Sequence, residues 1–568
     1  ISFVTQRFSG LSKNYQIAFG VLGETIEKYT PPIVYDVIAP TGQVLNPLEV
    51  TLSFRAADDD AINEIFIVTE DSQKIFFFDD GLHFDEDAGD NIYGNRFYLI
   101  EVFDDINNFM RINRISIPIT NYGSFGIGYN SNPVDFIISV SDLENNLLID
   151  TGVTNQRIRD LGLYDDVVFL FSGGFLLTGY SNNDLWGCGI TPSILIETMI
   201  PGRVNDSTNP NNRTYSINAN DPPFGIKWER WKDAVDIGAD FYDGDGDGIY
   251  NPVDLNNNGI WDPSEDMPDM LGDKTIWTIF NNGVPANERS RLEGEPKGIE
   301  IAQTVFASSD PELENVVFVR YRITNRGTVA DVLDSVIIGF WSDPDVGVDF
   351  ENDVVGCDTI LQSSICYGGP DPDTLGFRGT PPAFYTTLLQ GVPLQTINSD
   401  TAYIKRGPQL GEDIIIGFDN SKITSFVNFV KSDPIHGDPN DAIELRNYML
   451  GKLKLGDLLD PCEIDPWGGV FGGVDCNSIN PYLWYSGDPV TRTGWLNAPG
   501  TDQRMMLSTG PFDLLKDQPV EVIYAYVLGR GTDEINSIIV ARENVQRAIQ
   551  EYQSNFSSLA YNPGEPNI

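Results

Sequence analysis

Residues 316–324 read Val-Val-Phe-Val-Arg-Tyr-Arg-Ile-Thr. A period of two sends successive side chains to opposite faces of a strand, so both faces here carry apolar residues. Asn-Arg-Gly at residues 325–327 supplies a turn. The stretch therefore predicts a two-sided strand of a β-sandwich. Its two faces are Val317, Val319, Tyr321 and Ile323 on one side, and Phe318, Arg320, Arg322 and Thr324 on the other.

Strand patterns of this kind recur along the chain, separated by turn sequences. The chain has 54 glycines and 35 prolines to supply turns, and its 41% of hydrophobic residues is enough to form a real core. Helical periodicity appears at residues 440–453 and 533–552, the second with Thr532 or Asp533 as N-cap. Further strands are predicted at residues 50–54, 65–68, 75–78, 134–140, 167–180, 193–199, 299–307, 336–341, 414–418 and 520–528.

We therefore predict an all-β protein with an N-terminal immunoglobulin-like β-sandwich and a larger β-sandwich region that has long loops and one or two helices. The expected parts are a lead-in segment at 1–30, the immunoglobulin-like sandwich at 31–118, the larger region at 119–556 with an insertion at about 240–273, and a linker at 557–568. The chain starts at Ile1 without a signal-peptide pattern and ends in a proline-containing tail, so we expect a processed piece of a longer precursor.

The charge and composition exclude several classes of function. With 83 acidic and 36 basic residues, the formal charge is −47, so no nucleic-acid partner is expected. No run of 18 apolar residues occurs, so no membrane insertion is expected. His83 and His436 are the only histidines, and neither lies in a nucleophile motif. We therefore predict no catalytic residues and no enzyme activity.

The cysteine spacing predicts disulfides rather than a metal or redox centre. None of the five cysteines forms a Cys-x-x-Cys pair, which argues against zinc, haem c and thioredoxin-like chemistry. Cys357 with Cys366, and Cys462 with Cys476, are close pairs that would close short loops in an oxidising compartment. Cys188 is then left as a buried thiol.

The sharpest motif begins at Asp243 and reads Asp-Gly-Asp-Gly-Asp-Gly-Ile-Tyr-Asn-Pro-Val-Asp. Oxygen-bearing side chains fall at loop positions 1, 3, 5, 9 and 12, with glycine at position 6 for the sharp turn. This is the spacing by which a twelve-residue loop wraps oxygens around Ca²⁺, with the carbonyl of position 7 added. The predicted ligands are Asp243, Asp245, Asp247, Ile249 through its carbonyl, Asn251 and Asp254.

A second loop of the same spacing starts at Asp254, which is expected to end the first loop as well. Its remaining predicted ligands are Asn256, Asn258, Asp262 and Glu265, so calcium is the predicted cofactor. The alternative is a solvated acidic turn. Two other acidic clusters are weaker cation candidates, for which an ordinary hairpin turn is slightly favoured: Asp79, Asp80, Asp85, Asp87 and Asp90, and then Asp343, Asp345, Asp349, Asp353 and Asp358.

A group of aromatic residues in a Gly/Pro-rich segment suggests a different function. Flat rings can stack on sugars, although such rings also serve to pin a long loop to a sandwich, which we favour here. Paired carboxylates suit glycoside hydrolysis, but with 83 acidic residues such pairs occur by chance. The aromatic residues are Trp467, Tyr482, Trp484, Tyr485 and Trp495.

Several segments of the chain, taken together, carry a family resemblance. The tandem loops resemble those of dockerins and thrombospondin type 3 repeats over about 25 residues. Residues 120–556 resemble large secreted surface proteins of the Bacteroidota and Ignavibacteria group, which carry a type IX secretion sorting domain. This resemblance implies export and a place at the cell surface or in the matrix, and it implies no enzymatic activity. The matching segments are 169–179, the tandem loops, 319–327, 339–347, 485–491, 506–512 and the closing helix.

These observations lead to one expected function and one alternative. We expect a secreted, calcium-binding structural or adhesive protein of the bacterial cell surface or extracellular matrix, such as a subunit of a filament, sheath or surface layer. Its expected partners are further copies of itself or other surface proteins, with glycans as a further candidate. The alternative is an extracellular glycan-binding module, and a glycoside hydrolase ranks below both.

Overall fold

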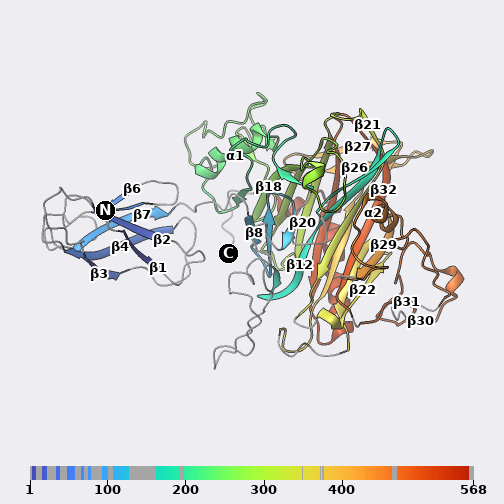
Figure 1. Cartoon of the computed structure of the whole chain (residues 1–568). Helices are drawn as coiled ribbons and strands as arrows, with labels where there is room; N and C mark the ends of the chain where they lie inside the picture. Colours follow the sequence, from blue (N-terminus) through green and yellow to red (C-terminus); the bar gives the residue numbers. More distant parts are fainter. Residues whose placement is uncertain are drawn as a thin grey trace. The chain divides into compact units, whose positions relative to one another are not determined.

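The chain divides into two compact units, residues 1–104 and 105–568 (Figure 1). The boundary lies before the predicted one at residue 118, because β8 (Asn107–Arg111) and β9 (Ile115–Thr120) pair with each other, and β9 pairs with a strand of the larger unit. The computed structural model describes residues 107–126, 161–190, 198–347, 350–370, 373, 376–430, 433–463, 470–499 and 501–561, together with the backbones of seven earlier strands.

The smaller unit contains two antiparallel sheets. The first has the order β1-β2-β5-β6 and the second the order β3-β4-β7. The predicted lead-in at 1–30 thus contributes two strands of the first sheet. The acidic cluster predicted between residues 79 and 90 lies outside the described residues. The strands are β1 (Phe3–Arg7), β2 (Gln16–Val21), β3 (Ile33–Ile38), β4 (Leu48–Ala57), β5 (Ile65–Val68), β6 (Lys74–Phe77) and β7 (Ile92–Leu99).

The larger unit is built on two antiparallel sheets of nine strands each. The first has the order β10-β9-β11-β12-β21-β32-β29, with β13 beside β12 and β8 beside β9. Its strands are β10 (Phe125–Gly126), β11 (Gly162–Tyr164), β12 (Val167–Ser181), β13 (Asp184–Gly189), β21 (Val332–Pro344), β29 (Ile423–Val430) and β32 (Gln503–Leu515), in addition to β8 and β9.

The second sheet has the order β14-β18-β19-β20-β33-β24-β23-β22, with β15 beside β18. Its strands are β14 (Ile200–Pro201), β15 (Tyr215–Asn218), β18 (Lys274–Asn281), β19 (Ile299–Ala307), β20 (Val316–Asn325), β22 (Asp353–Asp358), β23 (Ser363–Gly368), β24 (Ala383–Gln390) and β33 (Val520–Gly529). Small two-stranded ladders pair β16 (Phe241–Tyr242) with β17 (Met267–Pro268), β25 (Pro393–Gln395) with β28 (Phe418–Asn420), β26 (Thr401–Lys405) with β27 (Glu412–Ile416), and β30 (Val470–Gly472) with β31 (Gly494–Leu496). The all-β prediction is confirmed.

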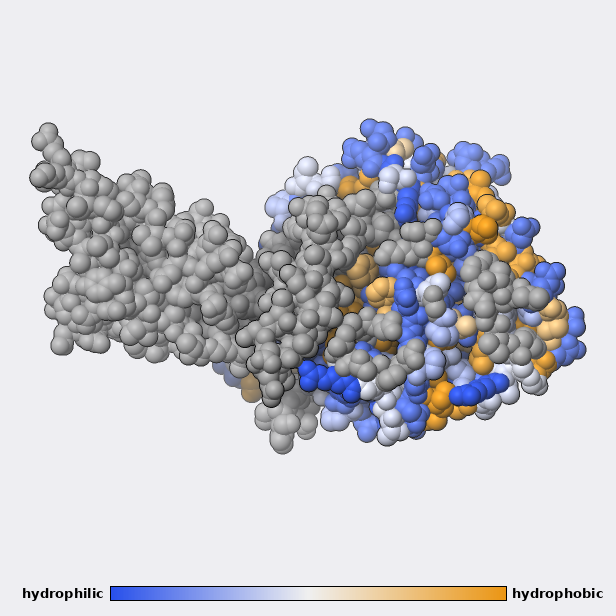
Figure 2. Space-filling model, turned by 60° about the horizontal axis from the view of Figure 1, so that its bottom comes forward, coloured by the Kyte–Doolittle hydropathy of each residue, from blue (hydrophilic) through white to orange (hydrophobic). Residues whose placement is uncertain are grey.

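The two faces of β20 separate the two halves of the core, as its alternation predicts. Val317, Val319 and Tyr321 join the largest hydrophobic cluster, to which strands of both nine-stranded sheets contribute. Phe318 faces the other way, into a second cluster formed with α3 (Glu534–Gln553). Figure 2 shows that hydrophilic side chains dominate one face of the larger unit, with hydrophobic ones scattered among them.

The described residues form three α-helices, of which two were predicted. α2 (Ala442–Met449) and α3 lie within the predicted ranges, give or take one residue, and Asp533 caps α3 by accepting from the Asn536 N–H at 2.8 Å. The third, α1 (Ile226–Asp236), was not predicted. None of the helices in the described part is long and apolar enough to cross a membrane.

Two predicted strands, 134–140 and 193–199, fall wholly or mostly outside the described residues. The predicted strand at 414–418 is divided between β27 and β28 by Gly417, whose φ of +86° breaks the extended chain. The remaining strands predicted in the larger unit are present.

The cysteines form one disulfide, between Cys462 and Cys476. The predicted bond between Cys357 and Cys366 is wrong, since both are buried free thiols. The reason is register: Cys366 lies opposite Val355, and Cys357 lies opposite Ser364, so the two thiols are diagonal neighbours on paired strands. Diagonal positions are about 7–8 Å apart, which exceeds the span of an unstrained disulfide. Cys188 is a buried thiol, as predicted.

Candidate calcium centre

The predicted calcium loops form a closed excursion from the second sheet. Residues 243–266 leave from β16 and return to β17, and these two short strands pair through Phe241 with Pro268 and Tyr242 with Met267. The base of the excursion packs on α1, where Trp228 and Trp231 are buried in an aromatic cluster. The paired strands and this aromatic cluster therefore hold the two ends of the loop segment together.

Two arginines of β20 tie both ends of this excursion to the sheet. Arg322 donates to Asp240 through both terminal nitrogens, at 3.0 and 2.6 Å, just before the first loop. Arg320 forms a buried ion pair with Asp269, just after the second loop. The two arginines of the strand pattern thus hold the insertion in place.

The first loop is organised by its own carboxylates. Asp243 accepts from the backbone N–H of Gly248 at 3.0 Å, and Asp245 accepts from the N–H of Asp247 at 3.1 Å. Asp247 in turn accepts from the N–H of Ile249 at 2.7 Å. Positions 1, 3 and 5 therefore fold the chain into a turn that carries several oxygen atoms.

The second loop repeats this pattern at the same positions. Asp254 accepts from the N–H of Gly259 at 2.7 Å, Asn256 from that of Asn258 at 2.9 Å, and Asn258 from that of Ile260 at 2.7 Å. The amide nitrogens of Asn256 and Asn258 also donate to the carboxylate of Asp262, at 2.5 and 3.0 Å. The sequence repeat is thus a structural repeat.

The backbone conformation is also repeated. Position 4 has a positive φ in both loops, +76° at Gly246 and +59° at Asn257. Position 6 does so too, with +79° at Gly248 and +76° at Gly259. Asparagine and glycine are the residues that adopt this conformation most readily, so the sequence fits the turn in both loops.

The carboxylate that closes the first loop by hydrogen bonds is not the one expected at position 12. Glu265 spans the second loop, accepting from the N–H groups of Leu255 at 2.7 Å and Asp262 at 2.9 Å, which are positions 2 and 9. In the first loop, positions 2 and 9 are Gly244 and Asn251, and both donate to Asp266, at 3.0 and 2.7 Å. Asp254 instead bonds only within the second loop in the described hydrogen bonds. Asp266 therefore stands where the prediction placed Asp254.

Asp266 is enclosed by the first loop, with only 2% of its surface exposed. Burial raises the pKa of its carboxyl, two backbone hydrogen bonds oppose that shift, and the neighbouring Asp245 and Asp243 carboxylates raise it further. These carboxylates repel one another unless a cation lies between them. Asn251 contributes its backbone to this arrangement, while its side chain is exposed.

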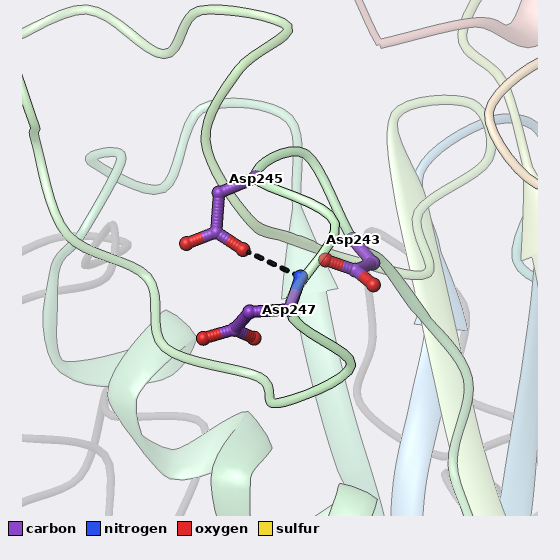
Figure 3. Close-up of side chains that lie close together, drawn as sticks. All are labelled: Asp243, Asp245 and Asp247. Carbon is purple, nitrogen blue, oxygen red and sulfur yellow. Dashed lines mark hydrogen bonds between the residues drawn. The ribbon is translucent and has the colours of Figure 1, made fainter.

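The carboxylates of the first loop gather closely enough to share one ion. Oxygen atoms of Asp243, Asp245 and Asp247 lie within 4.8 Å of one another and are solvent-exposed (Figure 3). The donor set consists of oxygen alone, which suits hard cations such as Ca²⁺ and is poor for zinc or copper. The residues present therefore fit calcium.

The second predicted acidic cluster is used by the fold instead. Asp343 is paired with Arg504 at 3.0 Å, and Asp358 is paired with Arg542 at 2.9 Å. Asp353 accepts from the backbone N–H of Val346 at 2.9 Å. Asp349 lies outside the described residues. These interactions favour the ordinary structural reading of this cluster.

The aromatic group proposed for sugar stacking is largely buried. Trp484, Tyr485 and Trp495 are at most 2% exposed, and the indole N–H of Trp484 donates to the Gly451 carbonyl at 3.1 Å. Tyr482 is 40% exposed, and Trp467 lies outside the described residues. The three buried rings pin the long loop to the sandwich and offer no flat exposed face to a glycan.

No protein-family model and no curated protein matches this chain.

Proposed function

We propose that this chain is a calcium-binding structural protein of an extracellular surface. The observation that carries the proposal is the repeat of one hydrogen-bond pattern and one backbone conformation in the loops that begin at Asp243 and Asp254. An ordinary acidic surface turn would not be expected to repeat both the hydrogen-bond pattern and the backbone conformation at the same positions. Twelve-residue calcium loops do need them, because their oxygens must face one point.

The chain's own residues would hold one ion in each loop. The bound ion would supply positive charge between carboxylates that otherwise repel, in a chain with a formal charge of −47. The candidate ligands of the first loop are Asp243, Asp245, Asp247, the Ile249 carbonyl and Asp266. Those of the second are Asp254, Asn256, Asn258, the Ile260 carbonyl, Asp262 and Glu265.

The role we propose for calcium is to lock the insertion onto the sandwich. Asp240 and Asp269 already join its two ends to β20 through Arg322 and Arg320. A loop whose ends are fixed transmits its own stabilisation to the strands that hold it, so bound calcium would stabilise the second sheet as well as the loops.

The wider setting of the protein is part of the same proposal. The resemblance to secreted surface proteins supports export to the cell surface or matrix and self-association there into a filament, sheath or layer. We also propose that the two sheets of the smaller unit form an immunoglobulin-like sandwich. Both ideas rest on sequence patterns.

The test uses the whole chain, stripped of metal and then titrated with calcium. We expect two ions per chain by calorimetry, and a melting temperature that rises by several degrees. When the free calcium concentration is a hundred times the Kd of a site, binding at that site stabilises the folded state by about 2.7 kcal/mol. Magnesium is the matched control, because its demand for octahedral geometry makes it bind weakly to such loops. Unchanged melting and no heat of binding would overturn the calcium proposal.

Self-association is tested in the same samples by light scattering. We expect larger particles with calcium than with chelator, because neutralised carboxylates no longer repel neighbouring copies. A monomer under both conditions, together with normal calcium binding, would leave the metal site standing and remove the assembly role.

A further inference from the structure

Tyr561, at the C-terminal end of the described residues, lies against two tryptophans, one in α1 and one in the second loop. Its ring centre is 6.1 Å from that of Trp228 in α1 and 6.0 Å from that of Trp261, at interplanar angles of 66° and 63°. Edge-to-face contacts of this kind fix ring orientation as well as burying apolar surface. Trp228 and Trp261 are almost completely buried, so this side chain completes their packing.

The backbone around Tyr561 is docked on the chain that leaves the second loop. The N–H of Gly272 donates to the Leu559 carbonyl at 2.8 Å, and Leu271 forms a β-bridge with Ala560. Leu559 is itself 2% exposed. Residues 557–561, which we call the C-terminal strap, are therefore held independently of the aromatic contacts.

Trp261 connects this strap to a candidate calcium ligand. It occupies position 8 of the second loop, and its indole N–H donates to the backbone carbonyl of Glu265 at 2.9 Å. The carboxylate of that same Glu265 spans the loop from Leu255 to Asp262. The orientation of the indole and the position of the carboxylate thus belong to one hydrogen-bonded turn.

The first loop is joined to the backbone of Trp228 through its own position 8. Tyr250 is 6% exposed, and its hydroxyl donates to the Trp228 carbonyl at 3.0 Å. Position 8 is therefore aromatic in both loops: Tyr250 of the first loop bonds to the backbone of Trp228, and Trp261 of the second loop contacts Tyr561 directly.

We infer that Tyr561 is a positioning residue for calcium binding, which acts on the second loop through Trp261. This inference rests on the proposed calcium function. Calcium held by Glu265 fixes Trp261 and so favours the docked strap, and the docked strap in turn favours the calcium-binding form of the loop. Such coupling is reciprocal, so each event must strengthen the other by the same factor.

The first experiment measures calcium binding to the whole chain by calorimetry. In parallel, Tb³⁺ is used as a probe of the same sites, and its luminescence is excited through tryptophan. We expect Tyr561→Ala to weaken one of the two sites roughly tenfold. Tyr561→Phe keeps the ring and should retain the wild-type affinity. Tyr482→Ala removes a half-exposed tyrosine of a different loop and serves as the matched control.

The second experiment needs no mutation and follows hydrogen exchange in wild-type protein. With excess chelator, we expect amides of the C-terminal strap and of Gly272 to exchange roughly tenfold faster than with calcium, while those of β20 change less. Normal calcium binding with unchanged exchange, or equal affinity in Tyr561→Ala, would overturn the inference and leave the calcium function intact. Absence of any binding by the wild-type chain would overturn both.

Discussion

Arg322 donates two hydrogen bonds to Asp240, of 3.0 and 2.6 Å, and thereby joins the middle of the second sheet to the start of the insertion that carries the two loops. Arg322 also lies 3.3 Å from Glu521 of β33, which in turn pairs with Arg406 at 2.9 Å. Burial alone would raise the pKa of Asp240, but Arg322 reverses that effect and lowers it. The pair is thus an ionised link between two parts of the fold.

Breaking this link is expected to destabilise the larger unit. Asp240→Asn and Arg322→Met should each lower the free energy of unfolding by about 1–3 kcal/mol, because each removes the charged hydrogen bonds between these two partly buried side chains. The double variant should cost less than the sum of the two. Urea denaturation monitored by tryptophan fluorescence measures the unfolding of the larger unit, since all nine tryptophans lie beyond residue 104.

An exposed pair provides the control for this comparison. Lys516 and Asp331 are 3.7 Å apart with side chains that are 48% and 82% exposed, so Asp331→Asn should leave the urea midpoint unchanged. If Asp240→Asn also left the urea midpoint unchanged, the link would contribute nothing to the stability of the larger unit.

Asp266 and Glu265 are expected to serve different loops although they are adjacent in sequence. Asp266→Asn should weaken one calcium site, and Glu265→Gln should weaken the other, each roughly tenfold to a hundredfold. The double variant should weaken both sites. Calorimetry on the whole chain measures this, with Asp236→Asn, an exposed carboxylate at the end of α1, as the control.

Substitution of Asp254 distinguishes this assignment of ligands from the ligand set predicted from spacing. If Asp254 belonged to both loops, Asp254→Asn would weaken both sites. The hydrogen bonds place it in the second loop, so we expect only the site that Glu265→Gln affects to change. Loss of both sites in Asp254→Asn would restore the shared-ligand interpretation.

The sequence was most informative where the structure depends on neighbours along the chain. The alternation of residues 316–324 predicted which side chains of β20 face each half of the core, because a strand has a fixed period of two. The helix α1 was missed, since Gly225 before it offers no side-chain cap.

Contacts between distant residues could not be read from spacing. The first loop receives Asp266 only because β16 pairs with β17 and folds the chain back on itself. The partners of Arg320 and Arg322 lie more than fifty residues away, and Cys357 failed to pair because of strand register. Local loop chemistry was therefore predictable, while what completes and anchors the loops was not.

Alanine and asparagine are expected to have different effects when they replace glycines of the first loop. Gly248→Ala places a side chain at a φ of +79°, which should cost about 1–2 kcal/mol and weaken calcium binding. Gly246→Asn should be nearly neutral, because Asn257 already adopts this conformation at the same position of the second loop. A Cβ atom meets nothing within 4 Å at either glycine, and their φ angles are nearly equal, so the expected difference lies in how readily asparagine and alanine adopt a positive φ. Thermal melting and calorimetry test both variants.

Acid should destabilise the larger unit partly through His436. This residue is fully buried, stacks on Trp484 with ring centres 5.4 Å apart, and donates from Nε2 to Asn428 Oδ1 at 3.1 Å. Burial lowers its pKa to about 4 from the usual 6.5. Because the unfolded chain binds the proton more readily, stability is full above about pH 6.5 and is lost as the pH falls towards 4, by up to roughly 3 kcal/mol.

His436→Gln separates this effect from the titration of the many carboxylates. Glutamine can still donate to Asn428 but takes up no proton, so the variant should be less stable at pH 7 yet lose less stability between pH 6.5 and 4. Urea midpoints measured across this range give the two slopes. The slope of the variant should be shallower by up to about 1.4 kcal/mol per pH unit, the amount that uptake of one proton contributes. Parallel curves would mean that His436 takes up no proton on unfolding and that its buried ring acts only through packing.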